Sequence, residues 1–381
     1  MSAPNDPILP PVTAVFGDDF FRELCFSLWH AHLRWLHTRV GFTDALRKRL
    51  RPAPAVPAGG FGHEMVDLLA QFIATTGLVN AHLGLTSSDI CDNVRLMQIE
   101  RATKLLHLGV TQWVLNFPEQ LVARLPGRWQ TWCAGLTHWQ PAAPLSWDHR
   151  IRAWVAPFLE YGNQPPIIHA KQFGGPVGDA ASLHLLCPGA DLVAVLRSFD
   201  WEPFGLEPPS SDYPLQSSDH ASELRAVQWA VRVGAQLHKV AQDWRVLAAL
   251  GVVRPAAPAA AGSSSMPGKV NPHRWEKVCG LCRSAATAAA EMWDVAAHNS
   301  LERTLDTSWQ LKHLLPRCFL TLAEAVDVLA ANPAVIDPAG NERLLVEHDA
   351  ELQRDRALTL RVLKGEDRWS AYLDLLKSAT S

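Results

Sequence analysis

The sequence predicts an all-α protein with a central bundle of long helices. Apolar residues recur at helical spacing over long stretches of the 381 residues. We find no convincing alternation of apolar and polar residues, the pattern of half-buried strands. Short breaks rich in proline, glycine and asparagine separate the periodic stretches. Long helices joined by short connections pack in antiparallel order, and such an arrangement is a helical bundle.

The periodicity predicts the helices one by one. They are expected at residues 20–37, 68–83, 93–124, 147–161, 219–250, 272–295 and 311–331. Pro118 should kink or interrupt the third helix, because proline lacks the amide hydrogen and its ring clashes with the preceding turn. Because of Pro316, the pattern does not fix the residue at which the last helix begins.

The chain is long enough to form more than one domain. Asn332 and Pro333 mark a boundary before a short C-terminal part. The pattern supports a small N-terminal helical domain over residues 1–92, a central bundle over 93–331 and a short helical domain over 332–381.

Charge and composition exclude several classes of function. A formal net charge of −3 gives no basic footprint for nucleic acid or for a membrane surface. No apolar run is long enough to span a bilayer, and the N-terminus does not have the pattern of a signal peptide. The seven cysteines, an odd number, predict free thiols in a reducing compartment, and we expect a cytoplasmic protein.

The segment from Ala261 to Glu276, A-G-S-S-S-M-P-G-K-V-N-P-H-R-W-E, has the strongest functional signal. Small residues precede it, which indicates a mobile loop. Asn271 and Pro272 then predict a helix start with an asparagine cap. Backbone amides at such a turn can hold an anion, and Lys269 adds a positive charge beside them. A plain linker would explain the serines and alanines, but not the lysine, asparagine and glutamate at fixed offsets.

This segment resembles the G-S-S-x-M-P-x-K-x-N-P signature of the fumarase/aspartase superfamily, in the branch of adenylosuccinate lyase and 3-carboxy-cis,cis-muconate cycloisomerase. Four further regions resemble the superfamily in order, between about Ala81 and Ser308. The resemblance implies a three-part helical lyase fold and a small dicarboxylate substrate. It also implies a homotetramer whose active sites form where segments of three subunits meet.

The first of these regions, His82-Leu-Gly-Leu-Thr-Ser-Ser-Asp89, is similar to the H-x-G-L-T-S-x-D of adenylosuccinate lyases. The hydroxyls and amides of Thr86 and Ser87 suit a substrate carboxylate, and the resemblance adds His82 to the same site. A capped helix start also explains the T-S-S-D run. Both interpretations can hold, because a helix cap is also an anion site.

The second region, Leu136-Thr-His-Trp-Gln-Pro-Ala-Ala-Pro144, resembles an R-T-H-G-Q-P-A-x-P segment in which the histidine is the general acid. His138 is the matching residue, although a lone histidine is more often structural. Leu136 replaces the arginine and Trp139 replaces the glycine, so the leaving-group pocket should be smaller or reshaped. Cycloisomerases have a tryptophan at the histidine position itself. His138 therefore favours a leaving group that needs a proton.

The third region joins Lys171-Gln-Phe-Gly-Gly-Pro-Val-Gly-Asp179, which looks most like the cycloisomerases, to an L-Q-x-x-x-H run typical of adenylosuccinate lyases. Gln216 in this run is either a substrate ligand or a solvated residue before a helix cap. Ser217, Ser218 and Asp219 stand where adenylosuccinate lyases have arginines, and phosphate binding favours such charged contacts. We therefore expect a small N-substituted aspartate or succinate rather than adenylosuccinate.

The fourth region, Glu302-Arg-Thr-Leu-Asp-Thr-Ser308, is similar to an E-R-D-x-x-x-S segment. Arg303 either holds a distal carboxylate or phosphate or pairs with a helix carboxylate. The resemblance also assigns Ser308, Ser264 and Met266 to substrate binding.

β-Elimination requires few catalytic groups. A proton α to a carboxylate is removed only if the resulting dianion is stabilised as it forms, and Lys269, Asn271 and the loop amides would do this. By resemblance the base is Ser263 as an alkoxide, whose pKa the same groups must lower. His138 would protonate the leaving group, with Glu276 orienting or charging the imidazole. Closure of the loop would exclude water.

The motifs and the resemblance leave three alternative functions. The first is a lyase that releases fumarate from a substituted succinate by β-elimination, with an amine-type leaving group. The second is an isomerase of the muconate cycloisomerase kind, which the Q-F-G-G run supports and His138 opposes. The third is a catalytically inactive structural or binding homologue, which the short C-terminal part leaves open. No metal or cofactor is implied. Cys279 and Cys282 form a C-x-x-C pair, but no second pair completes a zinc site, and His30 and His37 have no further ligands at metal spacing.

Overall fold

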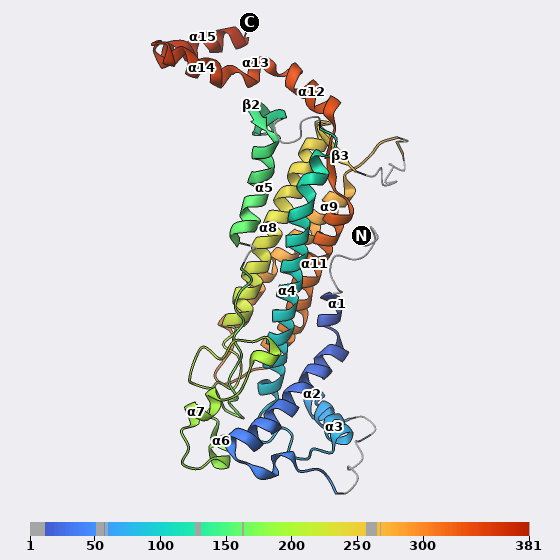
Figure 1. Ribbon diagram of the computed structural model, residues 1–381, viewed down its shortest axis with the longest axis vertical. Helices are drawn as coiled ribbons and strands as arrows, with labels where there is room; N and C mark the ends of the chain where they lie inside the picture. The colour runs from blue at the N-terminus through green and yellow to red at the C-terminus, as the bar shows by residue number, and fades with distance from the viewer. Residues whose placement is uncertain are drawn as a thin grey trace. The chain divides into compact units, whose positions relative to one another are not determined.

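The computed structural model describes residues 12–50, 57, 60–125, 131–161, 164–256, 265–266 and 268–380. Helices dominate these residues, so the predicted all-α class is confirmed (Figure 1). The chain divides into two compact units. Unit 1 comprises residues 1–108, 164–232 and 284–323, and unit 2 comprises residues 109–163, 233–283 and 324–381. The layout in three domains stays a prediction.

Three long helices contribute to both units: α4 (Ser87–Val122), α8 (Ala221–Ala249) and α11 (Asp306–Ala331). Unit 1 also contains α1 (Val12–Val15), α2 (Asp18–Trp35), the π-helix η1 (Leu36–Val40), the 3-10 helix η2 (Thr43–Leu46), α3 (Glu64–Thr76), α6 (Ala181–Leu186), α7 (Leu192–Arg197), the 3-10 helix η4 (Glu202–Phe204) and α10 (Ala288–Ala297). The other elements are α5 (Trp147–Tyr161), α9 (His273–Ala286), α12 (Pro338–Glu347), α13 (Asp349–Leu352), α14 (Arg354–Leu363) and α15 (Arg368–Thr380).

The predicted helices agree with the structure within a few residues, with two exceptions. The second predicted helix ends early, at Thr76, because Gly77 adopts a left-handed conformation (φ 74°) and its N–H closes the last turn on the carbonyl of Ile73. The sixth is two helices, α9 and α10, with a break at Thr287. Pro118 lies inside α4, which continues to Val122, so the proline does not interrupt the helix.

The expectation that strands are absent was wrong for two short two-stranded sheets, of which one is a hairpin. In one, β1 (Trp132–Thr137) pairs antiparallel with β2 (Gln140–Ser146); in the other, β3 (Val253–Pro255) pairs antiparallel with β4 (Ala334–Ile336). Small residues and prolines fill β2 in place of alternating apolar residues, so no strand signal arises. These sheets are too short to change the fold class.

Aromatic side chains form the core of unit 2. The ring of Trp113 on α4 stacks on Phe117 at a centroid distance of 4.6 Å and meets Phe158 of α5 at 5.6 Å. Trp244 of α8 contacts Trp113 at 6.3 Å and Trp275 of α9 at 5.4 Å. Tryptophans thus join four helices.

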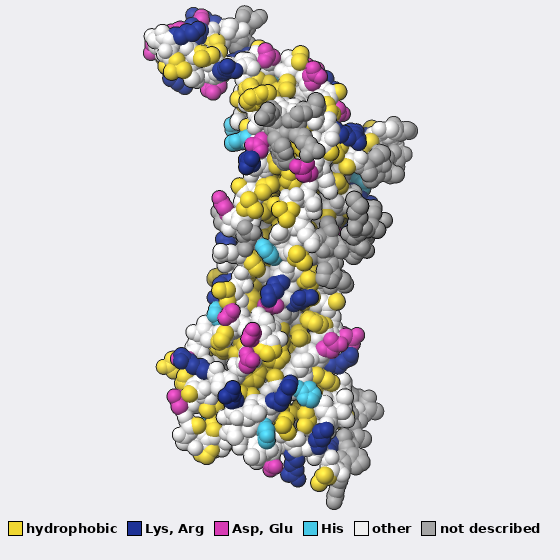
Figure 2. Space-filling view, viewed as in Figure 1, with side chains coloured by type: hydrophobic (Ala, Val, Ile, Leu, Met, Phe, Trp, Pro, Cys, Tyr) yellow, Lys and Arg dark blue, Asp and Glu magenta, His cyan; other side chains and the backbone are white. Residues whose placement is uncertain are grey.

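Basic and acidic side chains are interspersed on the face of the molecule that Figure 2 shows. No large field of one sign covers it, as the small net charge predicts. Within the described residues, no helix combines the length and the apolar character that a membrane span requires.

A buried ion pair holds the start of α4 against the segment from Lys171 to Gly175. Oδ1 of Asp89 accepts hydrogen bonds from Lys171 Nζ at 2.5 Å and from the amide of Gly174 at 2.8 Å. Oδ2 accepts from the amides of Gly175 at 3.0 Å and of Thr86 at 2.8 Å. The side chains of Asp89 and Lys171 are 0% and 4% exposed. Four donors on one carboxylate offset the cost of burying its charge.

We predict that Lys171→Met destabilises the protein by about 3–5 kcal/mol, because it leaves the buried Asp89 without its countercharge. Lys104→Met is the matched control, since Lys104 pairs with Glu100 on the surface of α4 and its side chain is 59% exposed. That loss should stay below about 1 kcal/mol. Urea unfolding followed by circular dichroism measures both. Equal midpoints for the two variants would refute the importance of the buried pair.

Candidate functional site

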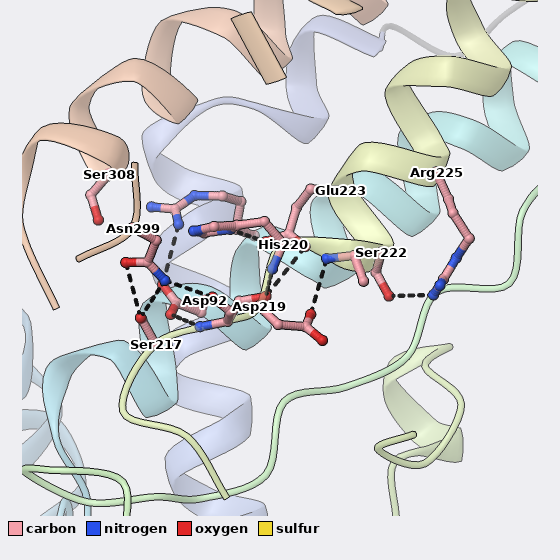
Figure 3. Close-up of polar contacts among 12 residues, drawn as sticks. Asp92, Ser217, Asp219, His220, Ser222, Glu223, Arg225, Asn299 and Ser308 are labelled. Atoms are coloured by element: carbon pink, nitrogen blue, oxygen red, sulfur yellow. Dashed lines mark hydrogen bonds and ion pairs between the residues drawn. The ribbon is translucent and has the colours of Figure 1, made fainter. Parts of the chain in front are cut away.

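Unit 1 brings together three of the segments predicted to bind substrate. The hydroxyl of Ser88, in the first turn of α4, donates to the carbonyl of Gln216. The hydroxyl of Ser217 donates to the carbonyl of Glu302 at 3.1 Å. It also accepts a hydrogen bond from the side-chain amide of Asn299 (Figure 3). The start of α4, the loop before α8 and the segment before α11 therefore meet in one hydrogen-bonded cluster.

Thr86 and Ser87 lie at the start of α4, half-buried. The carboxylate of Asp89 accepts from the amide of Thr86, and the amide of Asp89 donates to the carbonyl of Thr86 at 3.1 Å. This reciprocal pair is a helix cap, so the capped helix start is observed. The cap does not use the hydroxyls of Thr86 and Ser87, which suits an anion at this helix start.

Glycines explain how Gln216 is held. A Cβ at Gly178 would lie 2.6 Å from the amide nitrogen of Gln216, and one at Gly174 would lie 2.2 Å from the carbonyl oxygen of Leu215. Only glycine lets the two backbones approach so closely. The Oε1 atom of Gln216 is buried and has no partner among the described residues. It is therefore an acceptor that a ligand could satisfy.

His82 lies just before the same helix start and has a positive φ of 73°. The indole nitrogen of Trp29 donates to its Nδ1 at 3.2 Å, which leaves the hydrogen on Nε2. Burial lowers the pKa of His82, although the charge of Asp89 opposes this. The imidazole is therefore neutral at pH 7 and can act as a hydrogen-bond donor through Nε2.

A buried His–Glu pair belongs to the cluster and was not singled out from the sequence. Nδ1 of His220 lies 3.0 Å from Oε1 of Glu223, whose other oxygen accepts from Ser218 Oγ at 3.3 Å (Figure 3). Burial opposes the charged imidazole, but the hydrogen bond and charge of Glu223 and the charge of Asp92 outweigh it, so the pKa of His220 is raised. The pair could have been found from the sequence H-A-S-E, because residues three apart on a helix lie on the same face.

Asp92 and Arg95 of α4 complete this network. They form a buried ion pair at 3.2 Å, and the second oxygen of Asp92 accepts from the amide of Ser218 at 3.0 Å. Arg303 donates to Ser308 Oγ at 3.4 Å, and none of the described carboxylates lies within ion-pair distance of its guanidinium. A positive charge therefore remains available for an anion.

Unit 2 contains His138, at the tip of the β1–β2 hairpin. His138 and Trp139 form its two-residue turn with φ of 51° and 64°, the pattern of a type I′ turn. Both side chains are exposed, and that of Trp139 is 69% exposed. The hairpin thus presents the predicted acid to solvent within its own unit.

Unit 2 also contains the described part of the signature segment. Lys269 is exposed and Asn271 half-buried. The amides of Trp275 and Glu276 donate to the carbonyl of Pro272, so α9 begins one residue later than predicted. Glu276 is exposed and its Oε1 lies 3.7 Å from Nη2 of Arg245. Exposed Met266 also lies in this part, whereas Ser263 and Ser264 lie outside the described residues.

Among the described residues, no three histidine, cysteine or acidic side chains gather as metal ligands would. The seven cysteines are free thiols. Burial raises the pKa of Cys91, Cys282 and Cys318 to about 12, so these thiols are not nucleophiles at neutral pH.

Comparisons with known proteins agree with this architecture. Residues 63–286 match a family model described as Lyase. Adenylosuccinate lyase of Schizosaccharomyces pombe is 29% identical over 278 residues, which are 67% of this chain and 53% of that protein. Adenylosuccinate lyase of Synechocystis sp. is 27% identical over 338 residues, which are 81% of this chain and 71% of that protein. The chain spans about half the length of most of the curated relatives it matches.

Two solved structures share the fold. The fumarate lyase of Mesorhizobium sp. BNC1 has a TM-score of 0.73 at 18% identity and covers 98% of this chain and 86% of its own. The 3-carboxy-cis,cis-muconate lactonizing enzyme of Pseudomonas putida has a TM-score of 0.74 at 18% identity, with 97% and 85% covered. Because the family model covers more than half of the chain, the protein belongs to this lyase family, within the fumarase/aspartase superfamily.

Proposed function

We propose that the protein is a lyase that releases fumarate from a substituted succinate by β-elimination, with cleavage of a C–N bond. The hydrogen-bonded cluster of unit 1 is the observation that carries this proposal. It offers hydroxyls at a helix start, a histidine donor and a guanidinium that forms no ion pair with a described carboxylate, from Thr86, Ser87, His82 and Arg303. Such donors suit the two carboxylates of a succinyl group. Membership of the lyase family supports the same reaction class.

The proposed chemistry uses residues of unit 2. Ser263 removes the proton, and Lys269 and Asn271 stabilise the dianion that forms. His138 protonates the leaving group, and Glu276 orients or charges its imidazole. Glu276 faces Arg245 in this structure, so the proposal requires that contact to be exchanged. Ser264, Met266, Gln216 and Ser308 complete the proposed substrate contacts.

We also propose a cytoplasmic homotetramer whose active sites combine segments of different subunits. The superfamily resemblance supports this assembly. Sedimentation equilibrium should give four times the mass of the chain, and a monomer that releases fumarate would contradict the assembly.

The proposed substrate has a small leaving group. Trp139 is next to the proposed acid, and serines and an aspartate occupy positions where adenylosuccinate lyases have arginines. A bulky nucleotide phosphate therefore lacks the charged partners that it favours. Amine, nitro and hydrazine groups on a succinate fit this description.

We predict that at least one succinate adduct in a panel of amine, nitro, hydrazine and nucleotide leaving groups yields fumarate. Ultraviolet absorbance of the new double bond follows the release. We expect small adducts to react faster than adenylosuccinate, because of the tryptophan and the missing arginines. A folded protein that produces no fumarate from any adduct would contradict the proposed function and favour an inactive homologue.

His138→Ala should lower kcat by about 10² to 10⁴ for the best adduct, because the leaving group loses its general acid. His149→Ala is the matched control, since His149 is also an exposed histidine of unit 2. The control should keep the wild-type rate. Full activity in His138→Ala would refute the role of His138 as the general acid.

Lys269→Ala should lower kcat by about 10² to 10³, because the dianion loses its main electrostatic partner. Lys277→Ala is a suitable control, since Lys277 is a nearby lysine whose Nζ pairs with Glu324 at 2.5 Å. Steady-state kinetics compare the two variants. If both variants keep the wild-type kcat, Lys269 does not stabilise the transition state.

A further inference from the structure

His220 is a buried histidine beside the proposed substrate site, and the proposed chemistry does not use it. It is 3% exposed and directly precedes α8, in the loop that also carries Gln216 and Ser217. Its φ of 59° is left-handed, which is uncommon for a residue other than glycine. Such a conformation persists only where the surrounding contacts hold the residue, and it often occurs at functional sites.

The carboxylate of Glu223 joins His220 to this loop. One oxygen lies 3.0 Å from Nδ1 of His220, and the other accepts a hydrogen bond from the hydroxyl of Ser218 at 3.3 Å. The same hydroxyl accepts from the amide of His220 at 3.1 Å. The side chain of Glu223 is 0% exposed, so water does not hold it. The position of Ser218, which follows Gln216 and Ser217, therefore depends on the pair of Glu223 with His220.

Among the described residues, the charges that act on the imidazole come from α4 and α8. From α4, Asp92 accepts from the amide of Ser218 at 3.0 Å and forms an ion pair with Arg95 at 3.2 Å (Figure 3). From α8, Glu223 contributes the second carboxylate. These groups and the imidazole form one buried network behind the loop.

The other neighbours of the loop do not add a charge to this network. Asp219 is exposed, and its carboxylate accepts from the amide of Ala221 at 3.0 Å. From the segment before α11, the uncharged side-chain amide of Asn299 donates to the hydroxyl of Ser217 at 3.1 Å and to the carbonyl of Ser218 at 3.3 Å. The charge of the network is therefore set by its own four side chains.

The network is electrically balanced only when His220 is protonated. Asp92 and Glu223 are negative and Arg95 is positive, so the imidazolium supplies the second positive charge. Burial opposes this charge, and so does Arg95, but the hydrogen bond and charge of Glu223 and the charge of Asp92 outweigh them and raise the pKa of His220. A neutral imidazole would leave a buried negative charge without a partner, which is costly and repels an anion.

We propose that His220 is a positioning residue of the proposed substrate site, and that a dicarboxylate binds the form of the protein in which this imidazole is charged. Paired with Glu223, the imidazolium holds Ser218 in place and keeps the network neutral. Loss of its proton places a negative charge behind the loop that carries Gln216. This inference rests on the proposed function, because it describes how the same site is held ready for its ligand.

The direction of the pH dependence follows from the raised pKa. The pair stabilises the loop fully below pH 6.5, the ordinary pKa of histidine, and this stabilisation is lost as the pH rises through the higher pKa of the folded protein. Burial lowers the pKa of His82, so its imidazole stays neutral over this range. Fumarate keeps both charges there, because carboxyl groups titrate at lower pH.

The test is a fumarate titration of the full-length protein at several values between about pH 6 and pH 9, with the signals of ¹³C-labelled histidine followed by NMR. His220→Asn assigns the signal of His220. Asparagine tolerates a left-handed φ and retains a hydrogen-bond donor, but it carries no charge. The variant therefore removes the charge and disturbs the backbone little.

In the wild type, we expect the pKa of His220 to lie above 6.5 and to rise further when fumarate binds, because binding and protonation must favour each other reciprocally. The dissociation constant for fumarate should increase by about fivefold or more as the pH rises through this pKa. In His220→Asn, fumarate should bind about as weakly at low pH as it binds the wild type at high pH. His313→Asn is the matched control, since His313 is an exposed histidine of unit 1, and it should keep the wild-type profile.

A pKa of His220 at or below 6.5, or one that bound fumarate leaves unchanged, would overturn the inference and leave the substrate site in place. Both readings come from the wild type, so they do not depend on whether a variant folds. Fumarate affinity in His220→Asn equal to that of the wild type at every pH would overturn it as well. If fumarate does not bind the wild type at any pH, the proposed substrate site itself is wrong, and the inference is overturned together with it.

Discussion

The carboxylate of Asp89 is the interaction on which unit 1 depends. It neutralises Lys171, caps the helix start at Thr86 and accepts two amides of the glycine-rich segment. A buried charge is costly unless it is paired and hydrogen-bonded, and here all four contacts come from the protein itself. Asn93 adds two hydrogen bonds to the backbone of Lys171. These contacts leave α4 and the glycine-rich segment little freedom to move apart.

This constraint explains why the proposed substrate site has its form. With α4 held against the segment from Lys171 to Gly178, the backbone at Gly174 and Gly178 lies in close contact with the backbone of Leu215 and Gln216. That loop in turn bonds the segment before α11 through Ser217. Donors from three distant stretches are therefore arranged before a ligand arrives, which lowers the cost of binding. The proposed acid and the signature segment belong to unit 2 and are exposed, as groups that must meet a substrate or another subunit would be.

Much of this architecture could be predicted from local sequence patterns. The long helices have strong apolar periodicity, and T-S-S-D is a local cap signal, so both were found. The β1–β2 hairpin was missed because its turn, His138 and Trp139, has positive φ without glycine or asparagine. The His220–Glu223 pair was missed because its meaning depends on Asp92, more than a hundred residues earlier in the chain. The π-helix η1 was missed because apolar periodicity does not reveal a single wider turn.

The proposed function requires the cluster held by Asp89 to bind a dicarboxylate. A crystal structure of the protein with fumarate tests it most directly. We expect a fumarate carboxylate within hydrogen-bond distance of the Thr86 and Ser87 hydroxyls, with the Asp89–Lys171 pair intact. Fumarate bound elsewhere, with no contact to Thr86, Ser87, Gln216 or Arg303, would contradict it.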